Sequence, residues 1–349
     1  MSDPGANQPF AVRASVRRTA RDWLERDGRV ALATVVDTWG SAPVPIGGQL
    51  VVAPDGSFEG SVSGGCIEGD VITEAMDVLA DGRPRTLEFG VADETAWRVG
   101  LPCGGQVRLF IERLDRSDEG SRAFIERAVH ADSRRQGLLV QTRLADGQRE
   151  IFDTTMPDLP PEIARRLRSG QSKLLQTPQG EVFLHAMLPA ARIVIIGATH
   201  IAQVLCELAR MTDYEVTVID PRTAFASPER FSGVKILAEW PQDALPKVGL
   251  DPYTAVVVVA HVSHIDDEAL KVALRSDCLY VGALGSSRNQ AKRLERLTAA
   301  GMTSAELARI KNPIGLDIGA QTPAEIAVSI MAEVILAVRG PKAKPTQRA

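Results

Sequence analysis

The first third of the chain alternates between two spacings of apolar residues. Intervals of three and four residues, each run ending at a glycine, predict amphipathic helices over residues 12–28 and 67–82. Alternating or continuous apolar runs rich in valine and leucine predict strands between and after them. These strands span residues 29–40, 85–90 and 106–114, with a hairpin over 48–62 that turns at Pro54-Asp55-Gly56.

Residues 119–188 mix both spacings. They predict a hairpin over 136–154, a short helix over 160–170 and a last strand over 181–189, before a domain boundary near Pro189. Whether this stretch belongs to the first domain or forms a separate lobe is open. We therefore expect an N-terminal α/β domain over residues 1–188.

The pattern changes after residue 190. Continuous apolar runs bounded by turn residues alternate with helical runs, and that order predicts a parallel, doubly wound sheet of the Rossmann type over residues 189–340. A closing helix begins at Thr322-Pro323, with Glu325 as the partner of a capping box. Residues 341–349 are expected to be a disordered tail. The strand-like runs are 192–197, 214–222, 234–238, 255–261 and 279–285.

Composition narrows the function classes. The 349 residues are 44% hydrophobic and carry a formal net charge of −4, so a nucleic-acid partner is not expected. No apolar run is long enough for a transmembrane helix, and the first residues do not resemble a secretory signal. Four cysteines without a Cys-x-x-Cys pair fit a reducing cytoplasm and predict no metal site. Arginines 13, 17, 18 and 21 are expected on a solvated helix face.

A glycine turn follows the first strand of the second half. Gly197 begins Gly-Ala-Thr-His where a Rossmann phosphate loop belongs, and Asp220 ends the next strand, where an acid binds a ribose. Thr199 replaces the middle glycine, and its side chain obstructs the close approach of a pyrophosphate. The start of the helix predicted over residues 198–211 still attracts an anion. Gly197, Thr199, His200 and Asp220 are candidate nucleotide-binding residues, and nucleotide binding itself stays open.

Three more candidates follow later strands. His261 comes directly after the fourth strand of this half, at the edge where ligands bind in open α/β sheets. Ser286 and Arg288 follow the fifth strand, and their hydroxyl and guanidinium groups suit a phosphate. An inert loop histidine and a capped turn are the alternatives. Asp266 and the acids beside it are expected to be first-turn residues favoured by the helix dipole.

Two loops of the first half pair cysteine with glycine. Gly64 and Gly65 precede Cys66, and Glu68 follows it; Cys103 precedes Gly104 and Gly105. Glycine lets the backbone approach a ligand and turn N–H groups toward an anion, and a cysteine near a helix start is more readily a thiolate. The alternative is two tight turns with small buried cysteines. Glu68 is a proton acceptor, an orienting group or a plain first-turn acid.

Six motifs in one order resemble the XdhC/CoxI family: SGGCIEGDV, LPCGGQV, IGATHIA, VIDPR, YVGALGSSR and PIGLDIGAQTPAEIAVSI. The resemblance spans about residues 16–338. It implies an accessory factor that binds molybdenum cofactor, supports its sulfuration and inserts it into a hydroxylase of the xanthine dehydrogenase or CO dehydrogenase type. Implied partners are the apo-hydroxylase and a cysteine desulfurase. The residues carried over are Gly64, Gly65, Cys66, Glu68, Cys103, Gly104 and Gly105.

The sequence departs from this family at two positions of the second half. Thr199 stands where the family has glycine, and Ala260-His261-Val262 stands where it has Thr-His-Asp. An alternative function is an NAD(P)- or FAD-dependent oxidoreductase with Cys66 and Cys103 as a thiol pair, and a third is a scaffold between partner proteins. The cargo is molybdopterin or its cytosine dinucleotide, and a homodimer is the base-rate expectation.

Overall fold

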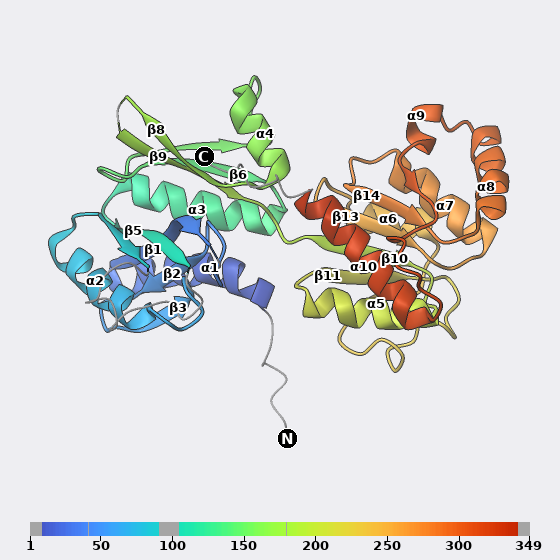
Figure 1. Ribbon diagram of the computed structural model, residues 1–349, viewed down its shortest axis with the longest axis horizontal. Coiled ribbons are helices and arrows are strands. Elements are labelled where there is room, and N and C mark those ends of the chain that lie inside the picture. The colour runs from blue at the N-terminus through green and yellow to red at the C-terminus, as the bar shows by residue number, and fades with distance from the viewer. Residues whose placement is uncertain (1–8, 41, 91–104, 179, 341–349) are drawn as a thin grey trace. The chain divides into compact units, whose positions relative to one another are not determined.

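The structure is a computed structural model that describes residues 9–40, 42–90, 105–178 and 180–340. The chain divides into two compact units, Met1–Pro189 and Ala190–Ala349, which are described separately (Figure 1). The predicted tail over 341–349 lies outside the described residues.

The N-terminal unit begins with a five-stranded antiparallel sheet in the order β3-β2-β1-β5-β4. Alternate residues of its central strand face opposite sides, as the period of two requires. Ala31, Ala33 and Val35 pack against α2, whereas Val30 and Leu32 pack against α1 and α3. The elements are α1 (Pro9–Asp27), β1 (Arg29–Trp39), β2 (Gln49–Val52), β3 (Phe58–Gly60), α2 (Glu68–Asp81), β4 (Arg85–Phe89), β5 (Gln106–Asp115) and α3 (Glu119–Arg134).

A second antiparallel sheet, β7-β6-β9-β8, completes this unit. Figure 1 shows α3 between the two sheets. Leu138 and Val140 share one apolar core with α1, α3 and the first sheet, while Leu139 faces α4 on the other side. The second sheet therefore shares an apolar core with the first sheet of the N-terminal unit. The elements are β6 (Leu138–Arg143), β7 (Arg149–Asp153), α4 (Pro161–Ser169), β8 (Lys173–Thr177) and β9 (Gly180–Met187).

The C-terminal unit is a six-stranded parallel sheet in the order β12-β11-β10-β13-β14-β15, which confirms the predicted doubly wound fold. Helices α5 and α10 cover one face, and α6, α7 and α8 cover the other. The elements are β10 (Arg192–Ile196), α5 (His200–Met211), β11 (Glu215–Ile219), β12 (Lys235–Leu237), α6 (Pro241–Val248), β13 (Thr254–Val258), α7 (Ser263–Leu274), β14 (Tyr280–Ala283), α8 (Ser287–Ala299), α9 (Ser304–Leu307), β15 (Ile310–Lys311) and α10 (Pro323–Arg339).

The expectation of a solvated arginine face on the first helix is wrong at Arg17. This side chain is buried, and its guanidinium donates two hydrogen bonds of 2.7 Å to the carboxylate of Asp132 on α3. The bidentate geometry offsets the loss of hydration. Arg17 therefore ties the first helix to the third.

Candidate functional site

Glu68 organises the first cysteine loop. As the first residue of α2, it accepts hydrogen bonds from the backbone N–H groups of Val62 (3.2 Å), Ser63 (3.0 Å) and Gly65 (2.9 Å). The hydroxyl groups of Ser61 (2.7 Å) and Ser63 donate to the same carboxylate. Burial raises the pKa of Glu68, but these hydrogen bonds outweigh it and lower the pKa to about 2. Of the predicted roles of Glu68, the geometry therefore favours a structural carboxylate that orients the loop. It does not favour a proton acceptor.

The two serine hydroxyls extend this network. Ser61 Oγ accepts from the N–H of Gly64 at 2.9 Å, and Ser63 Oγ accepts from the N–H groups of Cys66 and Ile67 at 3.0 Å each. The N–H groups of residues 62–67 are therefore used within the loop, so they hold its shape instead of pointing at a bound anion. Gly64 and Gly65 supply the left-handed turns, with φ of 78° and 107°.

The outer side of this loop is open. Cys66 is exposed, and a Cβ added at Gly65 or at Gly69 meets no atom of the described residues within 4 Å. Ile67 at the N-cap of α2 makes no side-chain cap, and among the described residues nothing accepts from the N–H groups of Gly69 and Asp70. A thiol and two N–H groups without an acceptor in the described part of the chain thus lie together at the start of a helix.

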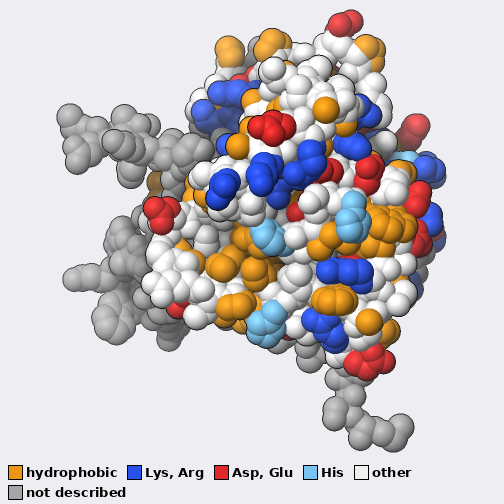
Figure 2. All heavy atoms as spheres, turned by 90° about the vertical axis from the view of Figure 1, so that its right-hand side faces the viewer, with side chains coloured by type: hydrophobic (Ala, Val, Ile, Leu, Met, Phe, Trp, Pro, Cys, Tyr) orange, Lys and Arg blue, Asp and Glu red, His pale blue; other side chains and the backbone are white. Residues whose placement is uncertain are grey.

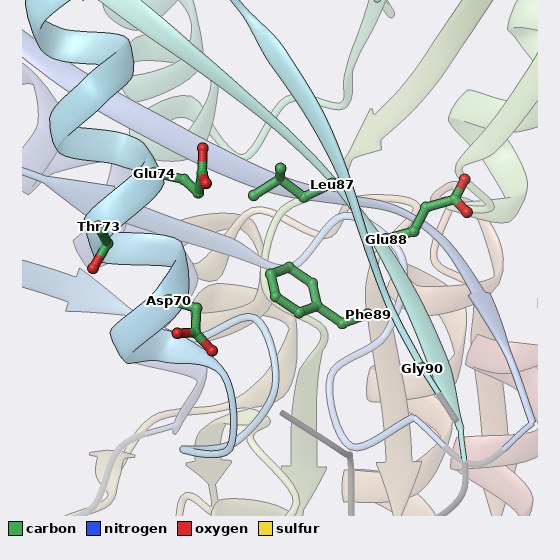
Figure 3. A pocket seen from close by; sticks show the side chains of 7 residues that line it. All are labelled: Asp70, Thr73, Glu74, Leu87, Glu88, Phe89 and Gly90. Atoms are coloured by element: carbon green, nitrogen blue, oxygen red, sulfur yellow. The ribbon is translucent and has the colours of Figure 1, made fainter. Parts of the chain in front are cut away.

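A pocket of about 430 Å³ lies beside this helix, between α2 and the edge strand β4 (Figure 3). Three carboxylates line it, of which Glu74 pairs with Arg85 at 3.1 Å and Glu88 pairs with Arg108 at 3.2 Å. Gly105 is buried just before β5, whereas Cys103 and Gly104 lie outside the described residues. The pocket is lined by Asp70, Thr73, Glu74, Leu87, Glu88, Phe89 and Gly90.

The phosphate-loop position of the C-terminal unit is shaped by close packing. Gly197 has a φ of 104°, and an added Cβ would lie 2.4 Å from the backbone of Ala260. Thr199 is the N-cap of α5 and accepts from the N–H of Ala202 at 3.3 Å. His200 is exposed in the first turn, with Nδ1 3.2 Å from the side-chain oxygen of Gln203. The threonine that replaces the loop glycine therefore has a capping function.

Asp220 is fully buried, and its carboxylate accepts hydrogen bonds from Ala198 and Arg222. It accepts from the N–H of Ala198 at 2.8 Å and from Arg222 through the backbone N–H and two guanidinium nitrogens, at 2.9, 2.9 and 2.6 Å. Burial raises its pKa, but the hydrogen bonds from Arg222 and Ala198 lower it further. Arg222 in turn covers the ring of Phe225 at 4.2 Å. The acid predicted to bind a ribose is thus occupied by its own chain.

The remaining predicted residues lie at the carboxyl edge of the same sheet. His261 is exposed after β13 with a φ of 57°, a conformation unusual for a residue with a side chain. Ser286 caps α8 by accepting from the N–H of Asn289 at 3.4 Å, and Arg288 is exposed in its first turn. Figure 2 shows the face of the molecule that carries this unit, with histidine side chains beside apolar and basic ones.

Sequence reasoning missed two features of this edge. Asp266 is a buried partner of Arg293 at 3.6 Å, although it was expected to be an ordinary first-turn acid. Trp240, at the N-cap of α6, packs against His264 with ring centroids 5.8 Å apart. The only local signal for either was its position directly before or within the first turn of a helix.

Models of known protein families match a segment in each half of the chain. A model of the XdhC and CoxI family matches residues 23–90, and a model of the XdhC Rossmann domain matches residues 193–334. The chain is therefore similar to the XdhC and CoxI family in both of its halves. The first match includes the Cys66 loop, and the second includes every predicted site residue of the C-terminal unit.

Curated relatives match nearly the whole chain. The molybdenum cofactor insertion chaperone PaoD of Escherichia coli is 28% identical, over 92% of this chain and 87% of its own. A probable subunit of xanthine dehydrogenase from Bacillus subtilis is 27% identical, over 89% and 94%. The crystal structure of a xanthine dehydrogenase from Bacillus halodurans has a TM-score of 0.66 at 24% identity, covering 95% of this chain and 98% of that one, which shows a shared fold.

No helix within the described ranges is long and apolar enough to cross a membrane.

Proposed function

We propose that this protein is an accessory factor that binds molybdenum cofactor as cargo and inserts it into a molybdenum hydroxylase. The names of the two curated relatives, a cofactor insertion chaperone and a probable xanthine dehydrogenase subunit, support this role. The structural observation that carries it is the Glu68 network, which holds the loop with the exposed Cys66 thiol at the start of α2.

The chemistry of the cargo fits this arrangement. Molybdopterin carries a phosphate and a dithiolene that holds the metal. The start of α2, with the N–H groups of Gly69 and Asp70, suits an anion, and Cys66 suits a soft metal or its sulfur ligand. The pocket of Figure 3 has no lysine or arginine among its lining residues to bind a phosphate. We therefore place the cargo over the loop and not in the pocket.

The proposed role in sulfuration follows from the accessible thiol of Cys66. We propose that Cys66 protects or relays the sulfur of the cofactor, with a cysteine desulfurase as donor and a hydroxylase of the xanthine dehydrogenase or CO dehydrogenase type as client. In a relay, the Cys66 thiolate attacks the outer sulfur of the desulfurase persulfide, and the desulfurase thiolate leaves. A homodimer and a second cargo contact from Cys103, Gly104 and Gly105 belong to the same proposal.

The test is equilibrium binding of anaerobically prepared molybdenum cofactor. We expect Cys66→Ala to weaken binding or to let the cofactor lose its sulfur, whereas Thr73→Ala, an exposed change on the same helix, behaves as wild type. Equal binding and sulfur retention in both variants contradicts the role of Cys66. No binding by wild type contradicts the function itself.

The oxidoreductase alternative gains no support from the described residues. Its ribose-binding acid, Asp220, is fully hydrogen-bonded to Arg222 and Ala198. Its thiol pair needs Cys103, which lies outside the described residues. Turnover of NAD(P)H by the purified protein, or a flavin bound to it, would support the oxidoreductase alternative.

A further inference from the structure

The first sheet of the N-terminal unit ends at a strand with one unpaired edge. β4 forms its ladder with β5, and no strand or backbone hydrogen bond of the described residues joins its other side. Helix α2 packs mainly over β1 and β5, and none of the five residues of β4 is buried. The N–H and C=O groups of such an edge can pair with a further strand.

The pocket of about 430 Å³ lies along this strand, on the side of α2. Figure 3 shows the side chains of Leu87 and Phe89 pointing from β4 toward the helix, whereas that of Glu88 points away from it. Leu87 and Phe89 are only partly buried against the core of the sheet, and they supply the apolar part of the pocket lining. A peptide strand paired with β4 places every second side chain beside this pocket, because side chains alternate between the two faces of a sheet.

The helix side of the pocket carries an excess of negative charge. Asp70, Glu74, Asp77 and Asp81 follow one another at intervals of four, three and four residues, so they share one face of α2. Arg85, on β4, forms ion pairs with the last three at 3.1, 3.3 and 2.9 Å. Asp70 forms no ion pair with the described residues. The single guanidinium therefore compensates this acidic face only in part, and least at the Asp70 end.

This charge decides which partner suits the edge. In an antiparallel pair of two β4 strands, one from each of two copies, both α2 helices lie on the same face of the joined sheet. Their acidic faces then approach each other across the contact, and like charges repel. A segment with lysine or arginine at alternate positions instead places its cationic groups beside Asp70 and Glu74. The edge therefore fits a basic strand better than a second copy of this chain.

We propose that β4 and the acidic face of α2 dock an extended, basic segment of a partner protein. The backbone of the segment pairs with the free edge of β4, and its basic side chains bind Asp70 and Glu74. In this mode the main chain supplies affinity and alternate side chains supply specificity. Asp70 lies four residues after Cys66, so the docked partner is held beside the exposed thiol. The surface goes beyond the proposed function, because it does not depend on which cargo the Cys66 loop binds.

Isothermal titration of the full chain with blocked peptides, in the absence of cofactor, tests the proposal. The probes are a short peptide of alternating lysine and threonine, the same peptide with glutamate for lysine, and the lysine peptide with all its backbone nitrogens methylated. We expect the lysine peptide to bind about tenfold more tightly than the glutamate peptide. Methylation is expected to abolish binding, because it removes the donors that pair with β4.

Charge substitutions on α2 locate the site. Asp70→Lys is expected to weaken the lysine peptide about tenfold and to tighten the glutamate peptide. Asp70→Asn is expected to weaken the lysine peptide about threefold, in the range of one partly exposed ion pair. Glu119→Gln, which changes an exposed acid in the first turn of α3, is expected to leave both affinities unchanged. The lysine peptide is also expected to slow hydrogen exchange at the outward-facing amides of β4.

Several results overturn the docking surface. They are equal binding of the lysine and glutamate peptides, tight binding of the methylated peptide, and equal affinities of the Asp70→Lys and Glu119→Gln variants for the lysine peptide. Slow exchange of every amide of β4 in the free protein overturns it too, because this edge is then already paired. Sedimentation velocity shows in that case whether a second copy or the same chain supplies the strand. Because the titrations contain no cofactor, a failure of the cargo proposal does not affect them.

Discussion

At the scale of single residues, Glu68 determines the shape of the Cys66 loop, and its ionisation links that shape to pH. Its folded pKa of about 2 is below the ordinary value of 4.5, so its contribution to stability is complete above pH 4.5 and is lost as pH falls toward 2. We expect Glu68→Gln to lower the free energy of unfolding at pH 7 on the order of 2–3 kcal/mol.

Urea unfolding of the wild type and of Glu68→Gln at pH 7 and at pH 3 measures this contribution. The difference between the two proteins is expected to narrow at pH 3. Glu74→Gln removes a half-exposed carboxylate of the same helix and is expected to change stability by less than about 1 kcal/mol at either pH. A difference that does not change with pH contradicts the proposed ionised network.

Alanine substitutions at Gly197 and Gly249 test how close packing adds to the cost of a positive φ. Both have positive φ, 104° and 69°, but an added Cβ meets the backbone of Ala260 at 2.4 Å in the first case and no atom within 4 Å in the second. We expect Gly249→Ala to cost about 1 kcal/mol, from backbone conformation alone. Gly197→Ala is expected to cost about 3 kcal/mol or more, because backbone must also move. Equal losses in thermal or urea unfolding would show that β10 and β13 do not meet here.

At the scale of elements, local sequence patterns were sufficient to predict most helices and strands. The alternation in residues 29–40, the glycine stop at Gly82 and the capping box of Thr322 and Glu325 each depend on neighbours along the chain, and each is present. The partners of Arg17 and Asp266 are 115 and 27 residues away, and no local pattern indicates them. The N–H groups of the cysteine loop turn inward because of two serine hydroxyls and Glu68, a choice that the glycines alone leave open.

Two capping boxes test how far a cap depends on the helix that it starts. Thr322 begins the 17-residue α10, which packs in the core, and Thr303 begins the four-residue α9, which buries none of its residues. We expect Thr322→Ala to lower the free energy of unfolding by about 1 kcal/mol, the usual value of an N-cap. Thr303→Ala is expected to change it by less than half as much in the same urea titration. Equal losses would show that the caps act independently of packing.

At the scale of the whole molecule, the apolar cores are separate. Every buried core cluster among the described residues draws its members from one unit only, with two clusters in the C-terminal unit and four in the N-terminal unit. Arg192, two residues after the boundary, bonds to the carbonyl of Val248 at 3.0 Å and to Thr254 Oγ1 at 3.2 Å within its own unit. A six-stranded sheet covered on both faces is large enough to be stable alone.

We therefore expect residues 190–349 to fold when expressed alone. Urea unfolding should be a single cooperative transition, with near-ultraviolet circular dichroism that shows fixed aromatic packing, because the clusters around β10 and β13 are complete in this fragment. A compact state without fixed packing would show that the N-terminal unit supplies part of the stability.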